Sequence, residues 1–334
     1  MFKDITIKEK SQGQRLDKFL AEVLTGKTRS QIQKLVKSGQ VLVNGRPAKV
    51  HRFLKTGEVI SFVENGQEQG ISKKTDAPFP YQPTDLPTYQ PKILHETLDF
   101  LVLEKPAGLL VHATDKGETD TLVDWLKDKY PEIENVGEEN YRAGIIHRLD
   151  KDVSGVMVAA KTNPAFFHLK EQFKERKVKK EYLALVYGKI GKPEGEITLP
   201  IGRGKSGQFV AHPRFGEDKY QDADKFAKTE YKVLEYIKDY TFLSVKILTG
   251  RTHQIRAHLS AIGHPILGDA IYRPKKNFLH LFSKRIKVID LPRPFLHSAK
   301  IGFYDLNNQW REFESPLPAE LKQFLNEKIK KIKN

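Results

Sequence analysis

The spacing of apolar residues predicts two helices and a small sheet near the N-terminus. An amphipathic helix is predicted by an apolar stripe at i, i+3, i+4 and i+7, formed by Leu16, Phe19, Leu20 and Val23. A second helix follows, with Thr28 or Ser30 as its N-cap and an apolar side formed by Ile32, Leu35 and Val36. Strands are predicted at residues 41–43 and 59–63, and the first of them runs into Asn44-Gly45, a pair typical of hairpin turns.

Further along the chain, strand-like and helix-like segments alternate without a regular repeat. Apolar runs predict strands at residues 100–103, 156–160, 182–187 and 242–247. Helices are predicted at residues 119–129 and 164–176. Because the order is not a repeating strand–helix–strand unit, we expect an α+β fold in which helices flank a mixed, mainly antiparallel sheet.

Proline interrupts the pattern between residues 64 and 91. The second half of this stretch contains Pro78, Pro80, Pro83, Pro87 and Pro91. Because proline fixes φ and has no amide donor, neither a helix nor a central strand can run through it. Residues 64–91 are therefore predicted to link two domains. Residues 319–334 are predicted to form a basic C-terminal helix or tail, whose lysines suit the negative end of a helix dipole.

The balance of charged residues indicates a class of partner. The 334-residue chain has 57 Lys and Arg against 42 Asp and Glu, a formal net charge of +15. A basic surface concentrates polyanions such as nucleic acid, although composition alone is equally compatible with a basic enzyme that has no such partner. Residues 15–60 favour nucleic acid, because they hold ten Lys or Arg and only three Asp or Glu. In the second predicted helix, Arg29, Lys34 and Lys37 would present a cationic face to phosphates.

Several kinds of site are excluded or disfavoured. The chain has no cysteine, which excludes disulfides, thiolate zinc sites, iron–sulfur clusters and a cysteine nucleophile. Among the 11 histidines, His253 and His258 are five residues apart, off the i, i+4 face used by helical ligand pairs, so we expect no metal. No stretch approaches the ~20 apolar residues of a membrane span, and the N-terminus lacks the apolar run of a signal peptide. We therefore expect a cytoplasmic protein without a membrane partner.

Residues 14–63 resemble an S4 RNA-binding domain. The resemblance is carried by three blocks in the family's order, Arg15-Leu16-Asp17-Lys18-Phe19-Leu20, Arg29-Ser30-Gln31-Ile32-Gln33-Lys34-Leu35 and Val41-Leu42-Val43-Asn44-Gly45. Each block alone is compatible with ordinary core packing, whereas the ordered run of three is specific. The resemblance implies a small αL-like domain that binds RNA, placed ahead of the linker.

Two polar segments of the second domain are candidates for chemistry. In residues 145–155, two isoleucines lead into a charged run that contains Arg148 and Asp150. A buried strand that leads into a charged loop often presents a side chain at a cleft, and a surface turn with local ion pairs is the alternative. In residues 248–259, Thr252 is predicted to cap a helix. The first two turns of that helix would hold Arg251, His253 and Arg256, and an ordinary polar helix start is the alternative there.

Together these segments resemble the RluA family of pseudouridine synthases, which convert uridine to pseudouridine in structured RNA. The matching blocks are His147-Arg148-Leu149-Asp150 with Ser154-Gly155, Lys180-Glu181-Tyr182-Leu183-Ala184, Gly250-Arg251-Thr252-His253-Gln254-Ile255-Arg256, and Gly263-His264-Pro265-Ile266-Leu267-Gly268-Asp269. Shorter blocks at residues 104–108 and 296–299 also fit. Val153 and Ala143 replace the family's usual Thr and Pro, which bears on substrate geometry rather than on activity. The resemblance implies a catalytic domain over residues 92–318.

The resemblance implies an isomerase with Asp150 as its catalytic carboxylate. The bond between ribose C1′ and uracil N1 breaks and the base rejoins through C5, so the carboxylate acts as a nucleophile at C1′ or as a base on the sugar. Because a buried carboxylate tends to take up a proton, a fixed cation is needed, and the resemblance assigns Arg256 to that task, with Arg251 as second choice. Tyr182 is implied to stack on uracil or to move a proton.

The same resemblance implies how RNA is held. Arg148 would fill the space left when the target base leaves the stack, and Arg251 and His253 would contact RNA. The oxidation state does not change, so no redox cofactor is required, and we expect no cofactor. The implied substrate is a uridine of large-subunit ribosomal RNA, bound by a monomer. A synthase acting on transfer RNA and an RNA-binding protein with an inactive site are the alternatives, and the intact Asp150, Tyr182 and Arg256 argue against the second.

Overall fold

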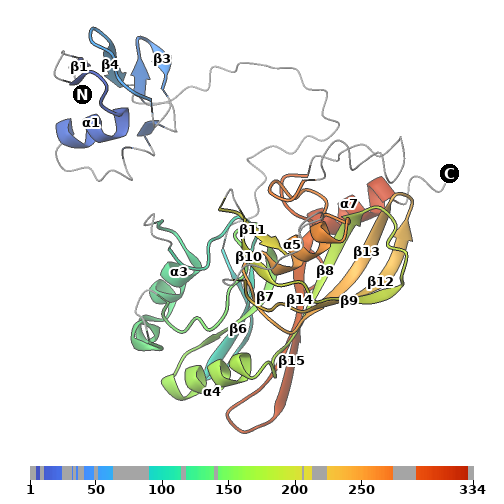
Figure 1. The fold of residues 1–334 in the computed structure, drawn as a ribbon. Helices are drawn as coiled ribbons and strands as arrows, with labels where there is room; N and C mark the ends of the chain where they lie inside the picture. Colours follow the sequence, from blue (N-terminus) through green and yellow to red (C-terminus); the bar gives the residue numbers. More distant parts are fainter. Residues whose placement is uncertain are drawn as a thin grey trace. The chain divides into compact units, whose positions relative to one another are not determined.

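In the computed structural model the chain folds into two compact units, Met1–Pro83 and Thr84–Asn334 (Figure 1). The boundary falls within the proline-rich stretch, most of which lies outside the described residues, so the predicted limits of the linker stay a prediction. The structure describes residues 5–7, 11–24, 32, 35–36, 41–48, 52–62, 90–113, 118–138, 142–204, 207–212, 224–273 and 291–329.

The first unit packs helix α1 (Leu16–Val23) on a four-stranded antiparallel sheet. The strand order is β1 (Ile5–Thr6), β4 (Val59–Phe62), β2 (Val41–Val43), β3 (Arg46–Pro47). Leu16 and Leu20 are fully buried, as the predicted stripe requires. Val23 is 43% exposed, contrary to the prediction, because the helix ends there and the non-helical Leu24 enters the core instead.

The predicted hairpin turn is confirmed between β2 and β3. Asn44 and Gly45 both have positive φ, 52° and 73°, as a tight hairpin of this kind needs. The second predicted helix is described only in part, at Ile32, Leu35 and Val36, and Ile32 and Val36 are buried in the core of this unit. Its candidate caps and its basic residues lie outside the described residues: Thr28, Ser30, Arg29, Lys34 and Lys37.

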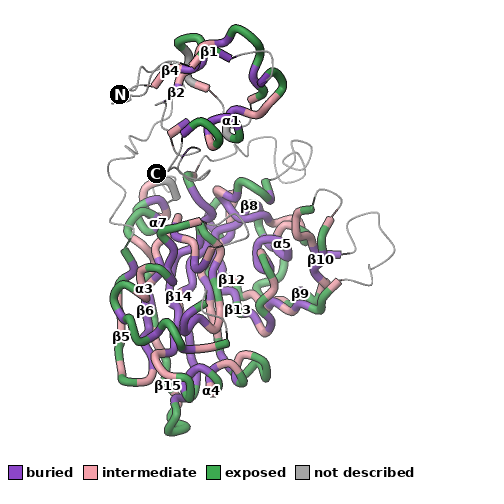
Figure 2. The backbone as a smooth tube through the Cα atoms, turned by 90° about the vertical axis from the view of Figure 1, so that its left-hand side faces the viewer, coloured by how far each residue is buried: buried purple, intermediate pink, exposed green. Residues whose placement is uncertain are grey.

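A nine-stranded sheet forms the centre of the second unit. The strands are β5 (Lys92–Glu96), β6 (Phe100–Lys105), β7 (Ser154–Ala160), β8 (Lys179–Tyr187), β9 (Glu194–Ile197), β12 (Thr229–Ile237), β13 (Tyr240–Ile247), β14 (Leu296–Tyr304) and β15 (Trp310–Glu314). Their order is β5-β6-β7-β14-β8-β13-β12-β9, and β15 pairs with β14. Neighbours are antiparallel except β7 and β14, which are parallel, so the predicted mixed, mainly antiparallel α+β fold is confirmed. Buried positions run through the central strands (Figure 2).

Helices and a small hairpin surround this sheet. They are α3 (Leu122–Lys129), the 3₁₀ turn at Pro131–Asn135, α4 (Asn163–Lys174), α5 (Gln254–Ala261), and the pair β10 (Ile201–Arg203) and β11 (Phe209–Ala211). Helix α3 begins three residues later than predicted, because Thr121 and Asp124 form a capping box that fixes its start. Helix α4 packs on β7 and β14, whereas α5 packs on β11 and β12.

The predicted C-terminal helix is part of the second unit's core. Helix α7 (Ala319–Phe324) buries Leu321 and Phe324 in the same apolar cluster as the sheet, and a π-helical turn at Leu325–Ile329 follows. Arg293 Nη2 donates to Glu320 Oε1 at 2.6 Å, which ties the start of the helix to the segment before β14. Apolar contacts therefore hold the beginning of the predicted C-terminal helix, and residues 330–334 lie outside the described residues.

The parallel contact of β7 and β14 depends on the absence of a side chain at Gly155. A Cβ there would lie 2.2 Å from the carbonyl oxygen of Ser298, and φ is +125°. We expect Gly155→Ala to lower the free energy of unfolding by about 2–3 kcal/mol, because backbone rather than a flexible side chain must move. Thermal unfolding followed by circular dichroism measures this. Gly191→Ala is the control, since its Cβ meets nothing within 4 Å, and equal stability of the two variants would contradict the expectation.

Candidate active site

Asp150 lies at the tip of a loop that leads directly into β7. Residues 145–147 run beside that strand, with Ile145 bridged to Ala159 and the imidazole Nε2 of His147 accepting from the Val158 amide at 3.1 Å. The His147 ring also stacks on Phe173, and burial lowers the pKa of His147 to about 3. The neutral imidazole accepts a hydrogen bond from a backbone amide and so holds residues 145–147 against the sheet. The loop that contains Asp150 therefore leaves the sheet and returns to it at fixed points.

Lys105 holds the other side of the same loop. Its side chain is fully buried at the end of β6, and its ammonium donates to the carbonyl oxygens of Pro106, Leu109 and Lys151 at 2.8, 2.9 and 3.0 Å. The Gly108 amide donates to the same Lys151 carbonyl at 2.8 Å. Burial lowers the pKa of Lys105 to about 7. The ammonium thus joins two loops through their backbones, one residue away from Asp150.

Arg256 connects Asp150 to a second carboxylate. Its Nη1 donates to Asp150 Oδ2 at 2.9 Å, while Nε and Nη2 donate to the two oxygens of Asp269 at 2.6 and 2.9 Å. The Arg256 side chain is 6% exposed and that of Asp269 is 0% exposed. This paired contact fixes the plane of the guanidinium, so that its remaining edge is directed at Asp150.

The charges of this cluster stabilise one another. Burial by itself would raise the pKa of Asp269, but the hydrogen bonds and charge of Arg256 outweigh burial, and the pKa of Asp269 is lowered. Burial likewise opposes the charge of Arg256, yet the two carboxylates raise the pKa of Arg256 above its ordinary value. Asp269 Oδ1 also accepts the amides of Ile271 and Tyr272, which fixes it from the backbone side.

Helix α5 begins one residue later than the sequence suggests. The N-cap is His253, not Thr252, and His253 has a left-handed φ of 56° and makes no side-chain cap. The reason is Gln254, whose Oε1 accepts from the Thr249 hydroxyl and the Arg251 amide at 2.7 and 3.0 Å, so its buried side chain organises the turn. Arg251 and His253 therefore precede the helix, and only Arg256 lies in its first two turns.

His253 stands beside Asp150 as a neutral group. Its Nε2 is 3.8 Å from Asp150 Oδ2, and its Nδ1 lies 3.2 Å from the hydroxyl of Tyr272. Burial lowers the pKa of His253 despite the nearby carboxylates, so the imidazole is uncharged at neutral pH. A non-glycine residue with this backbone conformation is strained, and such strain often accompanies functional sites.

Tyr182, on β8, lines the same cavity as this cluster. Its side chain is buried, at 6% exposure. Burial raises the pKa of Tyr182 far above its ordinary value, and the charge of Asp150 raises it further. The phenol is therefore protonated at neutral pH, which suits it to packing on an uncharged ring more than to accepting a proton.

One cavity of about 90 Å³ brings together all six site residues predicted for the second domain. They are Arg148, Asp150, Tyr182, Arg251, His253 and Arg256. Arg148 is exposed, and its Nη1 lies 3.0 Å from His112 Nε2. The predicted RNA-binding residues of the first unit, Arg29, Lys34 and Lys37, are outside the described residues.

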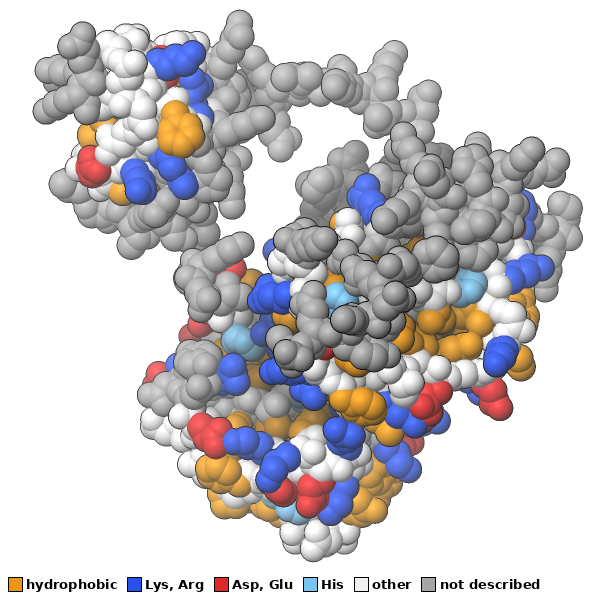
Figure 3. Space-filling model, viewed as in Figure 1, with side chains coloured by type: hydrophobic (Ala, Val, Ile, Leu, Met, Phe, Trp, Pro, Cys, Tyr) orange, Lys and Arg blue, Asp and Glu red, His pale blue; other side chains and the backbone are white. Residues whose placement is uncertain are grey.

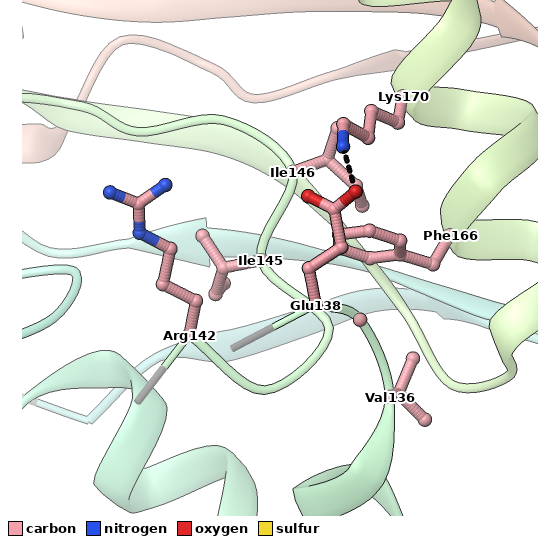
Figure 4. Close-up of a pocket in the computed structure, with 8 residues that line it drawn as sticks. Val136, Glu138, Arg142, Ile145, Ile146, Phe166 and Lys170 are labelled. Atoms are coloured by element: carbon pink, nitrogen blue, oxygen red, sulfur yellow. Dashed lines mark ion pairs between the residues drawn. The ribbon is translucent and has the colours of Figure 1, made fainter. Parts of the chain in front are cut away.

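A second cavity of about 80 Å³ lies beside α4 and has a different character. Glu138 and Lys170 face each other across it as an ion pair, and Arg142 lies apart from them (Figure 4). Both members of the pair are about half exposed, and exposed ion pairs typically contribute ~0–1 kcal/mol of stability. The remaining lining is mostly apolar, so the first cavity is the candidate active site.

Two further kinds of feature are absent from the described part of the chain. There, no three His, Asp or Glu side chains gather closely enough to hold a metal ion. No helix formed by the described residues is both long and apolar enough to cross a bilayer.

Two residues that shape the site had no role assigned from sequence. Asp269 appeared only within a family block, and no local pattern indicates that it pairs with Arg256, 13 residues earlier. Lys105 did leave a signal in the sequence. It is a lysine close behind the apolar run 100–103, at the end of a predicted buried strand and next to a proline.

Comparisons with known proteins give a consistent result. The family model described as RNA pseudouridylate synthase matches residues 99–261, and the S4 domain model matches residues 14–60. The chain is 34% identical to the "Uncharacterized RNA pseudouridine synthase YlyB" of Bacillus subtilis (strain 168), over 96% of both chains. It is 33% identical to "Ribosomal large subunit pseudouridine synthase D" of Yersinia pestis, over 96% of this chain and 93% of that one.

A solved structure agrees with these relatives. "Human RNA Pseudouridylate Synthase Domain Containing 1" matches with a TM-score of 0.52 and 28% identity, and the match covers 68% of this chain and 84% of that one.

Removing the charge of Asp269 tests the clamp around Arg256. We expect Asp269→Asn to lower the free energy of unfolding at pH 7 by about 3–5 kcal/mol, because a buried guanidinium loses its paired partner. The pKa of Asp269 is lowered in the folded state, so its stabilisation is complete above the unfolded pKa of about 3.9 and is lost as the pH falls through the folded value. Urea unfolding at pH 7 and at about pH 3 should therefore show a difference from the unaltered protein that shrinks in acid.

The matched control is Asp128→Asn on the exposed side of α3, which should change stability by less than about 0.5 kcal/mol. A loss at Asp269 no larger than this, or one that does not depend on pH, would show that the clamp does not contribute to stability.

Proposed function

Since the chain belongs to the RluA-type family of RNA pseudouridine synthases and carries an S4 domain, we propose that it acts on uridines of large-subunit ribosomal RNA, with Asp150 as the catalytic carboxylate. The activity of the family is an isomerisation of uridine in RNA. The observation that carries the assignment of Asp150 is its position in the cavity, where Arg256 holds it at 2.9 Å and Tyr182 also lines the wall.

The reaction needs one anionic group beside the ribose. The glycosidic bond between C1′ and N1 breaks, the uracil turns, and a bond forms between C1′ and C5. The C5 proton then leaves to solvent and N1 takes up a proton from solvent, so the product is an isomer of uridine. Asp150 acts either as the nucleophile at C1′ or as the base that removes a sugar proton. Arg256 holds this carboxylate in place by a hydrogen bond, and it is itself held by Asp269 rather than by substrate.

Tyr182 packs on the uracil while the base is detached. A buried, protonated phenol provides an apolar face together with a polar edge, and burial around it excludes water that would otherwise trap the ribose. Its raised pKa makes a phenolate rare at neutral pH, which favours this packing role over proton abstraction. His253, neutral and strained, closes the side of the cavity next to Asp150.

RNA is held by the arginines around the cavity and by the first unit. Arg148 and Arg251 line the cavity, and neither contacts a carboxylate within the described residues. They are therefore suited to phosphates and to the space left by the extruded base. In the S4 domain, Arg29, Lys34 and Lys37 are proposed to contact phosphates. The protein is proposed to act in the cytoplasm as a monomer, without metal or redox cofactor.

Ribosomal RNA is the proposed substrate because relatives that match over nearly the whole chain bear the name of large-subunit synthases. Transfer RNA is the alternative within the same chemistry. An inactive RNA-binding protein is disfavoured by the geometry, since a degenerate site has no reason to retain a carboxylate, an arginine and a second carboxylate in hydrogen-bond contact.

Removal of the Asp150 charge should abolish turnover. Asp150→Asn keeps the size of the side chain, so RNA affinity should stay within about tenfold, while tritium release from RNA labelled at uridine C5 should fall by at least about 10⁴-fold. Single-turnover tritium release and filter binding of the same RNA measure the two quantities. Asp152→Asn, at an exposed position of the same loop, is the control and should retain activity.

The same assay distinguishes the substrates. Release is expected from labelled large-subunit ribosomal RNA and not from labelled transfer RNA, and the reverse pattern would overturn the substrate assignment. Substantial turnover by a verified Asp150→Asn protein would remove Asp150 from its proposed role.

The first unit should supply affinity rather than chemistry. A fragment of residues 84–334 keeps the whole cavity and its own apolar core, so it should turn over a short RNA at saturating concentration. Its affinity for long structured RNA should fall, because a tethered domain raises the effective concentration of the other. The slope of log K against log salt should become shallower by ~0.7–0.9 for each phosphate that the fragment no longer binds. A slope equal to that of the full chain would show that the basic first unit does not touch RNA.

A further inference from the structure

Three segments of the second unit meet at one end of the sheet, next to the cavity. Strands β8 and β12 begin at this end and β13 ends there, since Glu181 pairs with Lys246 and Thr229 pairs with Ile247. Arg176 lies just before β8, Phe226 just before β12, and Arg251 just after β13. Residues that are far apart in the sequence are thus neighbours at this edge.

Phe226 is an exposed aromatic residue held in a fixed position. Its side chain is 47% exposed, although the next residue, Ala227, is fully buried and the preceding Lys225 is bridged to Ile201. Arg251 Nε donates to the Phe226 carbonyl at 3.1 Å. The backbone is therefore anchored on both sides, which fixes the point from which the ring projects.

A cation lies over the exposed ring of Phe226. The guanidinium carbon of Arg176 lies 5.5 Å from the centre of the Phe226 ring, within the range of a cation–π contact. Within the described residues, neither Arg176 nor Arg251 contacts a carboxylate. Lys and Arg side chains are spread over the visible face of the second unit (Figure 3). Both arginines are thus available to an anionic ligand.

We propose that Phe226 is a stacking platform for an unpaired RNA base next to the target uridine, with Arg176 and Arg251 on the flanking phosphates. This inference rests on the proposed function, because Arg251 also lines the cavity that holds Asp150. Extrusion of a uridine leaves its neighbour with an uncovered face, and aromatic rings beside arginines cover such faces in single-stranded RNA recognition.

The surroundings of the ring favour a base over a protein side chain as the occupant. A protein partner would need a contiguous apolar patch, whereas Phe226 directly follows the exposed Lys225 and its ring lies beside the guanidinium of Arg176. A nucleotide matches both features, because it presents a flat ring together with a negative charge.

The first test removes the aromatic ring and leaves every charge in place, by substitution in the full-length chain. Phe226→Leu keeps an apolar side chain but removes the ring, so the KM for labelled ribosomal RNA should rise about 5- to 150-fold, the equivalent of one stacked base, while kcat stays within about twofold. Phe226→Tyr should restore the KM of the unaltered protein. Phe167→Leu on α4 is the matched control, because Phe167 is 51% exposed, and its KM should not change.

The second test reads stacking directly and does not depend on turnover. Fluorescence of Phe226→Trp should be quenched by single-stranded oligouridylate and much less by an RNA duplex of equal length. Phe167→Trp contains the same two native tryptophans and an added exposed one, so it controls for their background fluorescence. Its fluorescence should respond neither to the single strand nor to the duplex.

The outcomes distinguish this inference from the proposed function. An unchanged KM in Phe226→Leu, or equal quenching of Phe226→Trp by duplex and single strand, would overturn the stacking platform even if the unaltered protein is fully active. Quenching by the single strand alone would support the platform even if tritium release by the unaltered protein failed, and that failure would count against the proposed function only.

Discussion

The contact on which the site depends is the buried guanidinium of Arg256 between Asp150 and Asp269. Burying a single charge costs free energy. If Arg256 were paired with Asp150 alone, its position would depend on the one carboxylate that the proposed function needs for chemistry. Asp269 solves this by accepting two hydrogen bonds from one edge of the guanidinium and two from backbone amides. The other edge is then free to hold Asp150 without being displaced by it. Asp150 is thus held by a cation whose own position is set at its opposite edge by Asp269.

The backbone around Asp150 is constrained as strictly as its side chain. The loop starts beside β7, where His147 accepts the Val158 amide, and it returns to β7 at Gly155, whose missing side chain lets β14 approach. Between these points, the Lys105 ammonium binds the Lys151 carbonyl. A buried lysine whose pKa is lowered to about 7 is a poor source of a permanent charge but a good donor, and all three of its hydrogen bonds go to carbonyl oxygens. The loop is therefore supported by the neutral imidazole of His147 and by a buried ammonium whose three N–H groups are all bound to backbone carbonyls, while Arg256 supplies the cation that contacts Asp150.

Much of this arrangement was predictable from sequence, but only where local pattern determines it. The helix at Leu16–Val23, the strands at the apolar runs and the convergence of Asp150 with Arg256 follow from spacing and family blocks. The insertion of β14 between β7 and β8 does not, because strand pairing over more than 100 residues leaves no periodic signal. The start of α5 was misplaced for a related reason. A threonine is a good cap by propensity, yet the side chain of Gln254 binds the residues before it and moves the first helical residue. Side-chain hydrogen bonds outweighed the cap preference of threonine there, whereas for Asp269 no local pattern indicates the pairing with Arg256.

The distribution of charge shows how a buried anion and a polyanionic ligand can coexist. Phosphates approaching the cavity add negative potential, which disfavours an ionised carboxylate below them. Arg148 and Arg251 line the cavity and have no carboxylate partner within the described residues, so in the proposed function their charge is available to the phosphates. The charge of Arg256, in contrast, is already committed to two carboxylates and is screened little by solvent. His253 stays neutral between them, so it neither competes for Asp150 nor adds to the attraction of phosphate. In the proposed function, binding and chemistry therefore draw on different cations, and a change in Arg148 or Arg251 should alter affinity for RNA without disturbing the contact between Arg256 and Asp150.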